Sequence, residues 1–301
     1  MGRRTITLKT KNYKDEEIEY EFNKTLYYIL KRIQFRVMNK LDGVIIIDGF
    51  VGAGKSNLGT GICGTWETFF KRRHNLDNVH FIVESVVKFT DREGNETMPC
   101  HFDESIQGGS SRDTITKGGH LLKITLITKR RKRHIYLFVV DNIKELSEKI
   151  VERCNVYINV QYKETQFKII KGITRIFSKR EALKIWSKWK EGSINKYKQA
   201  EAQKMINNKW SFICPDYSNI WFSEDEYDKK KVKETKLLEV KSDKVMEQRN
   251  KAIMCLLDKG VKQQEIGNAI GLSRSLIADI KAKMSSLSLN TYSTSQRGEG
   301  K

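Results

Sequence analysis

The sequence is short of proline, of paired cysteines and of long apolar segments. Its 301 residues include two prolines and five cysteines, which are Cys63, Cys100, Cys154, Cys214 and Cys255. Because the cysteines form no C-x-x-C pair, they are typical of reduced thiols in a cytosol. No apolar run approaches the roughly 20 residues of a membrane span, and residues 1–11 lack the apolar centre of a signal peptide. We therefore expect a cytoplasmic protein without a membrane span.

Acidic residues are also outnumbered. Asp and Glu total 37 against 56 Lys and Arg, which gives a net charge of +19 and a pI near 9.6. Such an excess favours a polyanionic partner, because binding releases counterions from it. A soluble, lysine-rich protein from an AT-rich genome would show the same balance. Charge alone therefore leaves both interpretations open.

Glycines gather after one apolar run of β-formers, residues 44–47. The segment that follows fits the pattern G-x-x-x-x-G-K-[ST], which predicts a loop whose backbone N–H groups and following helix bind phosphates. Lys55 would neutralise the β- and γ-phosphates, and the hydroxyl of Ser56 would bind Mg²⁺. A glycine-rich turn without a nucleotide would leave this Lys-Ser pair unexplained. The predicted cofactors are ATP and Mg²⁺, and the predicted binding residues are Gly49, Gly52, Ala53, Gly54, Lys55, Ser56 and Asn57.

An acidic pair, Asp103 and Glu104, follows a short strand pattern. ATP hydrolysis needs one carboxylate in the Mg²⁺ shell and another that polarises the attacking water. We assign Asp103 to the metal and Glu104 to the water, with a plain surface pair as the alternative because the strand is short. Cys100 and His101 stand side by side, but no second pair lies at ligand spacing, so packing is the better interpretation.

Residues 135–140 form the apolar run IYLFVV, which predicts a central parallel strand buried on both faces. In ATPases with an added central strand, a polar side chain at its tip contacts the γ-phosphate or the water, and Asn142 stands at that tip. The basic cluster 129–133 precedes the strand. Arg130 and Arg133 either contact nucleic-acid phosphates, serve a neighbouring subunit's nucleotide, or belong to a solvated helix end.

The remaining patterns of the first half complete the fold class. Alternating residues predict an N-terminal hairpin from strands 5–10 and 17–22, and Asn23 is placed to cap the helix that follows. Strands are expected at 79–83 and 154–160, with helices at 54–70 and 143–153. This order predicts an α/β fold with a mainly parallel central sheet.

Several of these segments resemble the core of the HerA/FtsK-type ATPases, including virus packaging ATPases and zonular occludens toxin-like proteins. The segments are GFVGAGKS, FDES, SRD at 111–113, RRKRHIYLFVVDN and LSEKIVERCNVYINV, and the resemblance covers about residues 41–160. Where that family usually has Gln at the tip of the sensor strand, this chain has Asn142. The resemblance implies an oligomeric, ATP-driven motor, such as a ring, that acts on DNA. It also implies that an arginine of one subunit completes the next site, with Arg130, Arg133 and Arg153 as candidates.

Beyond residue 163, lysines alternate with aromatic residues. Positive charge with stacking faces is typical of a nucleic-acid surface. The helical spacing of Leu183, Ile185 and Trp186 instead favours a core role for these residues. Residues 228–241 are charged and lack Gly and Pro, which predicts a helix or linker to a separate unit.

The C-terminal pattern predicts three helices, at 245–259, 263–270 and 273–281, with Gly271 in a tight turn. The segment QQEIGNAIGLSRSLIADI resembles the helix-turn-helix of resolvases and transcription regulators, with Ile266, Ile270, Leu272, Ile277 and Ile280 as its expected core. The third helix would then enter the major groove of double-stranded DNA, and the residues facing the bases would be Ser273, Arg274, Ser275 and Asp279. A helical protein-interaction domain is the alternative.

We therefore predict an ATPase core at 1–165, a basic aromatic-rich extension at 166–240, a helix-turn-helix at 241–284 and a disordered tail at 285–301. The predicted function is an ATP-hydrolysing DNA motor that moves or packages viral or mobile-element DNA. The alternative is an ATP-switched DNA-binding regulator or recombination accessory protein with slow hydrolysis. Glu104 separates the two, because only a motor needs fast water activation.

Overall fold

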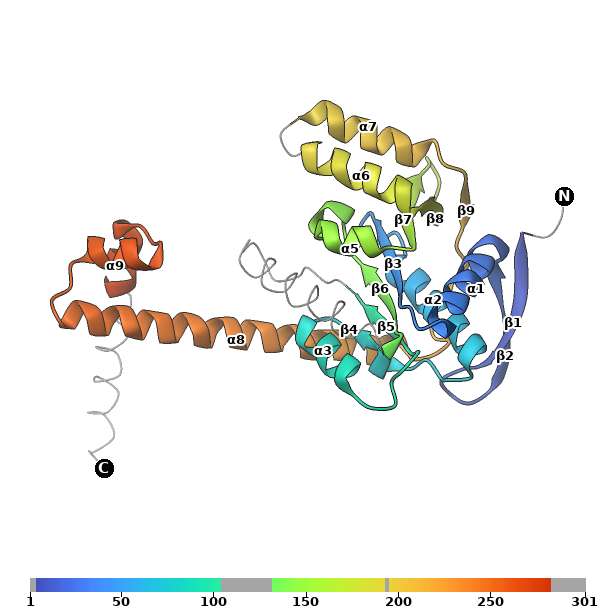
Figure 1. The fold of residues 1–301 in the computed structure, drawn as a ribbon, viewed down its shortest axis with the longest axis horizontal. Coiled ribbons are helices and arrows are strands. Elements are labelled where there is room, and N and C mark those ends of the chain that lie inside the picture. The colour runs from blue at the N-terminus through green and yellow to red at the C-terminus, as the bar shows by residue number, and fades with distance from the viewer. Residues whose placement is uncertain (1–3, 104–131, 193–194, 283–301) are drawn as a thin grey trace. The chain divides into compact units, whose positions relative to one another are not determined.

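The computed structural model describes residues 4–103, 132–192 and 195–282, and divides into two units, 1–235 and 236–301. The first unit contains the sheet, and the second contains the C-terminal helices (Figure 1). Helix α8 (Glu224–Asp258) begins in the first unit and ends in the second. In the described part of the chain, no helix combines the length and apolarity needed to cross a membrane.

The first unit begins with the predicted hairpin. Strands β1 (Thr5–Lys11) and β2 (Glu17–Asn23) pair antiparallel. The side chain of Asn23 accepts a hydrogen bond of 3.0 Å from the Leu26 N–H and so caps α1 (Lys24–Met38), as predicted. Figure 1 shows α1 and α2 (Lys55–Phe70) between this hairpin and the large sheet.

The large sheet has seven strands in the order β4-β5-β6-β3-β7-β8-β9. The first five run parallel, β8 pairs antiparallel with β7, and β9 pairs antiparallel with β8, so the predicted mainly parallel α/β fold is confirmed. Their bounds are β3 (Gly43–Gly49), β4 (Val79–His80), β5 (Pro99–Phe102), β6 (Ile135–Val139), β7 (Val156–Glu164), β8 (Ile169–Ser178) and β9 (Ser211–Ile213). Strand β6 lies between β3 and β5, where a buried apolar run belongs.

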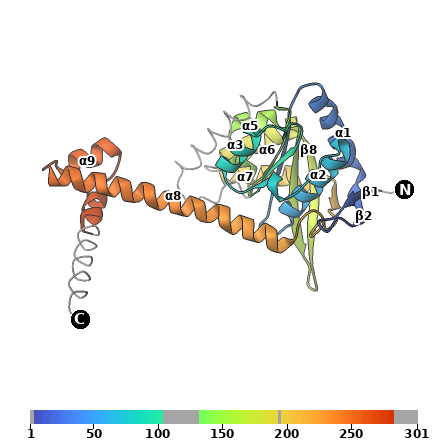
Figure 2. The same cartoon turned by 90° about the horizontal axis from the view of Figure 1, so that it is seen from below.

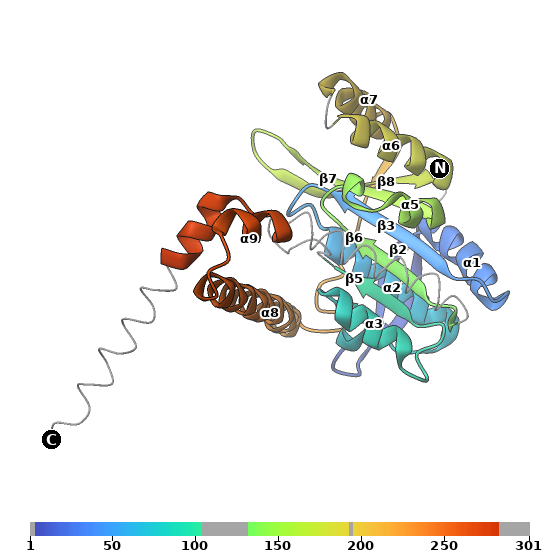
Figure 3. The same ribbon diagram turned by 60° about the vertical axis from the view of Figure 1, so that its left-hand side comes forward.

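Alternation along β3 divides the core into two layers. Ile45 and Ile47 pack with α1 and α2 on one face, whereas Val44 and Ile46 pack with helices of the other face. Those helices are α3 (Val83–Asp91), α5 (Glu148–Arg153), α6 (Lys179–Gly192) and α7 (Lys196–Asn207). Figure 2 shows the two groups of helices on opposite sides of the sheet, and in Figure 3 α6 and α7 lie side by side beyond β8.

Two predicted elements of the first unit differ in the structure. The strand expected at 79–83 ends at His80, and Val83 begins α3 instead. The helix expected at 143–153 is interrupted, with a 3₁₀ turn η3 (Ile143–Glu145) followed by α5. A second 3₁₀ turn, η1 (Leu76–Asn78), precedes β4. Of the basic cluster 129–133 that precedes β6, residues 129–131 lie outside the described residues.

The predicted extension at 166–240 does not form a separate region. Strands β8 and β9 continue the large sheet, and Tyr217 and Trp221 are buried in the core beside α2. A boundary at 165 would cut the antiparallel pairing of β7 with β8. The aromatic residues of this segment therefore divide, since Phe167, Tyr197 and Trp210 remain exposed while the others are partly or fully buried.

The second unit contains the end of α8, α9 (Gln263–Ile270) and a helix at 274–282. Its core consists of Ile253, Ile266, Ile277 and Ile280. A Cβ at Gly267 would stand 2.5 Å from the Leu272 carbonyl oxygen, which explains the small residue where α9 meets the turn. The expectation that Ile270 is buried is wrong, because its side chain is 44% exposed.

Candidate functional site

The glycine-rich loop begins where β3 ends. Gly49, Gly52 and Gly54 have φ angles of 139°, 74° and 98°, a region that side chains disfavour. A Cβ at Gly49 would lie 1.8 Å from the Val160 carbonyl oxygen, whereas a Cβ at Gly52 or Gly54 would have no atom of the described residues within 4 Å. Gly49 thus allows close contact with β7, and the other two glycines allow the turn into α2.

Helix α2 begins without a capping side chain among the described residues. Its first intrahelical bond runs from the Leu58 N–H to the Gly54 carbonyl, at 3.1 Å. The N–H groups of residues 55–57 therefore precede the regular hydrogen-bond ladder, at the positive end of the helix dipole. This arrangement is suited to an anion such as a phosphate.

The ammonium group of Lys55 is buried among oxygen atoms. It donates to the Gly49 carbonyl at 2.9 Å, to the Phe50 carbonyl at 3.3 Å and to the Asp141 carboxylate at 2.8 Å. The Asp141 side chain is 61% exposed. The lysine is thus held against its own loop and can exchange one exposed carboxylate for a phosphate without losing charge compensation.

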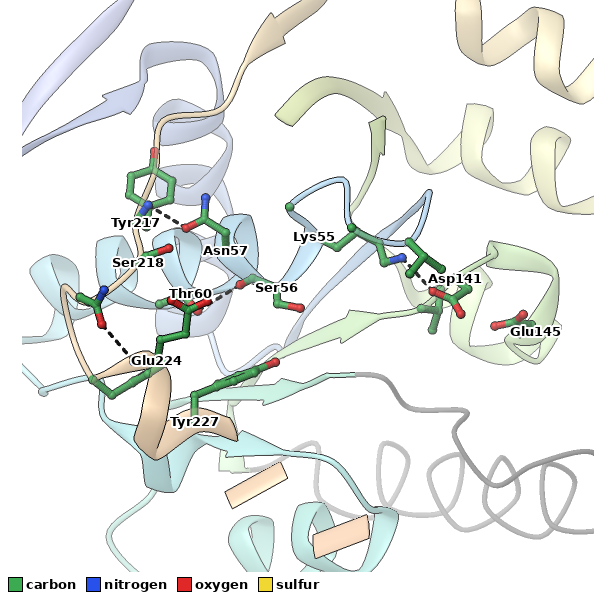
Figure 4. A pocket seen from close by; sticks show the side chains of 16 residues that line it. Lys55, Ser56, Asn57, Thr60, Asp141, Glu145, Tyr217, Ser218, Glu224 and Tyr227 are labelled. Carbon is green, nitrogen blue, oxygen red and sulfur yellow. Dashed lines mark hydrogen bonds and ion pairs between the residues drawn. The ribbon is translucent and has the colours of Figure 1, made fainter. Parts of the chain in front are cut away.

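A cavity of about 370 Å³ opens beside this loop. Three segments line it: the loop with the start of α2, the residues that follow β6, and the chain from Tyr217 to Tyr227. Figure 4 shows Ser56 and Thr60 facing the cavity from α2, with Asp141 and Glu145 on another wall. Hydroxyl and carboxylate oxygens are the ligands that Mg²⁺ prefers, so the lining fits both a phosphate and this ion.

The predicted nucleotide-binding residues do not all line the cavity. Gly52, Gly54, Lys55, Ser56 and Asn57 do. Gly49 lies below it, and Ala53 is buried, with its carbonyl accepting from the Gly172 N–H.

Asn57 lines the cavity, and its side chain also makes two contacts within the protein. Its side-chain amide donates to the Pro215 carbonyl at 3.0 Å and accepts from the Tyr217 N–H at 2.7 Å. Because both polar atoms of the side chain are occupied, Asn57 anchors the far wall of the cavity to α2 (Figure 4).

Asp103, the predicted metal ligand, follows β5 at the same edge of the sheet but does not line the cavity. It is fully buried, and its carboxylate accepts a hydrogen bond from the Tyr227 hydroxyl. Tyr227 is the residue that lines the cavity at this point. Glu104 and Arg130 lie outside the described residues.

Asn142, Arg133 and Arg153 do not line the cavity. The Asn142 side chain accepts from the Lys144 N–H at 3.0 Å and so begins η3, while the neighbouring Asp141 contacts Lys55. Arg133 and Arg153 precede β6 and β7, at the edge of the sheet opposite the glycine-rich loop. The guanidinium of Arg153 is paired with Asp42 of the same chain.

A buried carboxylate supports the loop from below. Asp48 of β3 accepts hydrogen bonds from the Ile143 N–H at 2.9 Å, the Tyr157 hydroxyl at 2.7 Å and the Asn159 amide at 2.8 Å. Burial raises its pKa to about 6, although these bonds favour the charged form. Asp48 therefore joins β3, η3 and β7 directly beneath the loop.

This pKa predicts a pH-dependent stability. The folded chain holds the Asp48 proton more tightly than the unfolded chain, so the stabilisation from protonation is present at acid pH and lost as pH rises through about 6. Relative to Asp48→Asn, the wild type is expected to lose roughly 1 kcal/mol of unfolding free energy between about pH 5 and pH 7.5. Urea unfolding of both proteins at the two pH values measures this, and parallel pH dependences would contradict it.

Sequence reasoning missed the wall formed by residues 217–227, because they are far along the chain from the loop and carry no motif. Asp141 had a signal, since it directly follows the central strand, but its neighbour Asn142 fitted the tip position equally well.

In the second unit, Ser273, Arg274, Ser275 and Asp279 are all exposed, as direct base contacts require. The Ser273 hydroxyl accepts from the Leu276 N–H at 3.2 Å, so this residue also caps the helix at 274–282.

Comparison of the chain with protein-family models and with curated proteins gives no match.

Proposed function

We propose that this protein is an ATP-hydrolysing motor of the HerA/FtsK type that moves or packages DNA. The observation that carries the proposal is the strand order, with β6 inserted between β3 and β5. Because carboxyl ends of parallel strands share one edge, this order brings the Lys55 loop, Asp141 and Asp103 to the same edge of the sheet. Ligands of open α/β sheets bind at that edge.

In this proposal, the loop amides and the start of α2 bind the triphosphate, and Lys55 turns from Asp141 to the γ-phosphate. Ser56, Thr60 and Asp141 supply oxygen ligands for Mg²⁺, which neutralises charge developing on the phosphates. Asp103 takes its predicted place in the Mg²⁺ shell once the Tyr227 hydroxyl no longer donates to its carboxylate. The second unit, with Arg274 best suited to guanine, recruits the motor to double-stranded DNA.

A DNA-binding regulator switched by ATP is the second candidate. It is favoured by the observed arrangement of the site. There, Lys55 is paired with Asp141, and the Tyr227 hydroxyl donates a hydrogen bond to the Asp103 carboxylate. Such a site would bind nucleotide and turn it over slowly. Helix α8 begins at the cavity wall with Glu224 and would carry the change toward the second unit.

Steady-state ATP hydrolysis, with and without long double-stranded DNA at fixed salt, tests the proposal. A motor predicts that DNA stimulates hydrolysis by about tenfold or more, equivalent to lowering the barrier by about 1.4 kcal/mol.

Glu104→Gln is expected to keep ATP binding and lose turnover by about 100-fold or more, because general-base assistance is removed. Glu152→Gln, a carboxylate of α5 paired with Lys149, is the control.

Weak hydrolysis that ignores DNA, together with tight binding to one DNA sequence, would favour the regulator. Unchanged hydrolysis in Glu104→Gln would refute the assignment of the water-polarising carboxylate.

A further inference from the structure

Three metal-binding side chains meet between α2 and β5. They are Cys63 of α2, His74 of the loop that follows it and His101 of β5, and all three are buried. One ligand atom from each lies within 4.8 Å of the others. None of the three lines the cavity beside Lys55, so this cluster is separate from the proposed nucleotide site.

The packing of α2 on β5 creates the cluster. Gly59 stands one turn before Cys63, and a Cβ there would lie 2.6 Å from Nε2 of His101. Side chains alternate along β5, so His101 faces α2 whereas Cys100 packs in the opposite layer. The His74 ring is held by edge contacts with Trp221 and Phe222.

The two imidazole rings of the cluster lack well-formed hydrogen bonds to the described residues. By distance and angle, none of the four ring nitrogens of His74 and His101 has a hydrogen-bond partner among the described residues. Burial lowers the pKa of His101 and brings that of His74 to about 3, opposed there by the nearby Asn78, and it raises the pKa of the Cys63 thiol. Each unpaired buried group costs about 1–3 kcal/mol, which calls for a partner.

We propose that Cys63, His74 and His101 bind one Zn²⁺ ion that ties α2 to β5. Neutral imidazole nitrogens and a cysteine sulfur are zinc ligands, whereas Mg²⁺ and Ca²⁺ prefer oxygen. Ligand atoms around a tetrahedral zinc stand about 3.3–3.7 Å apart, so the three atoms converge by about 1 Å on binding. The thiol loses its proton to solvent as it binds.

The surroundings balance the charge of such an ion. Zn²⁺ with one thiolate retains a single positive charge, and the buried carboxylate of Asp103 has its Oδ2 3.8 Å from Nε2 of His101. Asp103 is placed to orient His101. The ion therefore fixes the helix that begins at the glycine-rich loop to β5, the strand that Asp103 follows.

The test uses the full chain, freed of metal with a chelator and then titrated with Zn²⁺ or Co²⁺. We expect about one metal ion per chain by elemental analysis and a higher melting temperature with Zn²⁺. Co²⁺ should give the visible bands of a tetrahedral site and a near-ultraviolet thiolate-to-cobalt band. These readouts need no variant, so they remain decisive if a core substitution fails to fold.

Cys63→Ser should abolish the thiolate band and most of the zinc binding, and His101→Gln should weaken both. Cys100→Ser is the matched control, because this buried thiol is the chain neighbour of His101 but faces away from the cluster. Absence of bound metal in the wild type, or a thiolate band that survives in Cys63→Ser, would overturn the proposal.

Discussion

Replacing Lys55 with alanine is expected to lower the affinity for ATP·Mg²⁺ by about 100-fold or more. The ammonium is the one cation among the residues described as lining the cavity. A charge-assisted hydrogen bond to phosphate contributes about 1.5–3 kcal/mol, and the upper value corresponds to this loss. Isothermal titration calorimetry with ATP and Mg²⁺ measures it directly. Hydrolysis should fall with binding, since the triphosphate is no longer positioned.

Lys144→Ala is the matched control for this experiment. Lys144 belongs to η3 near the same edge of the sheet, but its ammonium lies over the Trp189 ring and does not line the cavity. The control removes one positive charge from this region and should bind ATP nearly as well as the wild type. Equal losses in the two variants would mean that general electrostatics, rather than a phosphate contact, explain the effect. Melting temperatures show whether each variant is folded.

Replacing Gly49 with alanine is expected to cost more than about 3 kcal/mol of unfolding free energy, enough to prevent soluble expression of many domains. The new Cβ would stand 1.8 Å from the Val160 carbonyl oxygen, which also accepts the Phe50 N–H at 3.2 Å. Relief of this clash requires β7 to move away from β3, and the loop would lose its anchor. Urea unfolding, or the soluble yield if the variant does not fold, gives the measurement.

Gly52→Ala separates packing from backbone conformation. Gly52 also has a positive φ, of 74°, but its Cβ would have open space. This variant should lose only about 1–2 kcal/mol, the cost of a left-handed conformation for a residue with a side chain. Similar losses at the two positions would show that the close contact between Gly49 and Val160 does not control stability.

The sequence by itself determined the elements that depend on local chemistry. The hairpin, the Asn23 cap, the buried strand before the glycine-rich loop and the apolar run of β6 all follow from periodicity and capping, and the structure confirms each. The Lys55 and Ser56 positions follow from spacing alone. Such patterns are read over a few neighbouring residues, where backbone geometry limits the choices.

Only the tertiary structure decided which distant groups meet. It placed Tyr227 on Asp103, Asp141 rather than Asn142 on Lys55, and residues 166–235 in the same unit as the sheet. It also brought together Cys63, His74 and His101, which have no ligand spacing in the sequence. These contacts arise because one helix packs against a particular strand of an ordered sheet. Side chains far apart along the chain become neighbours only after strand order and helix packing are established.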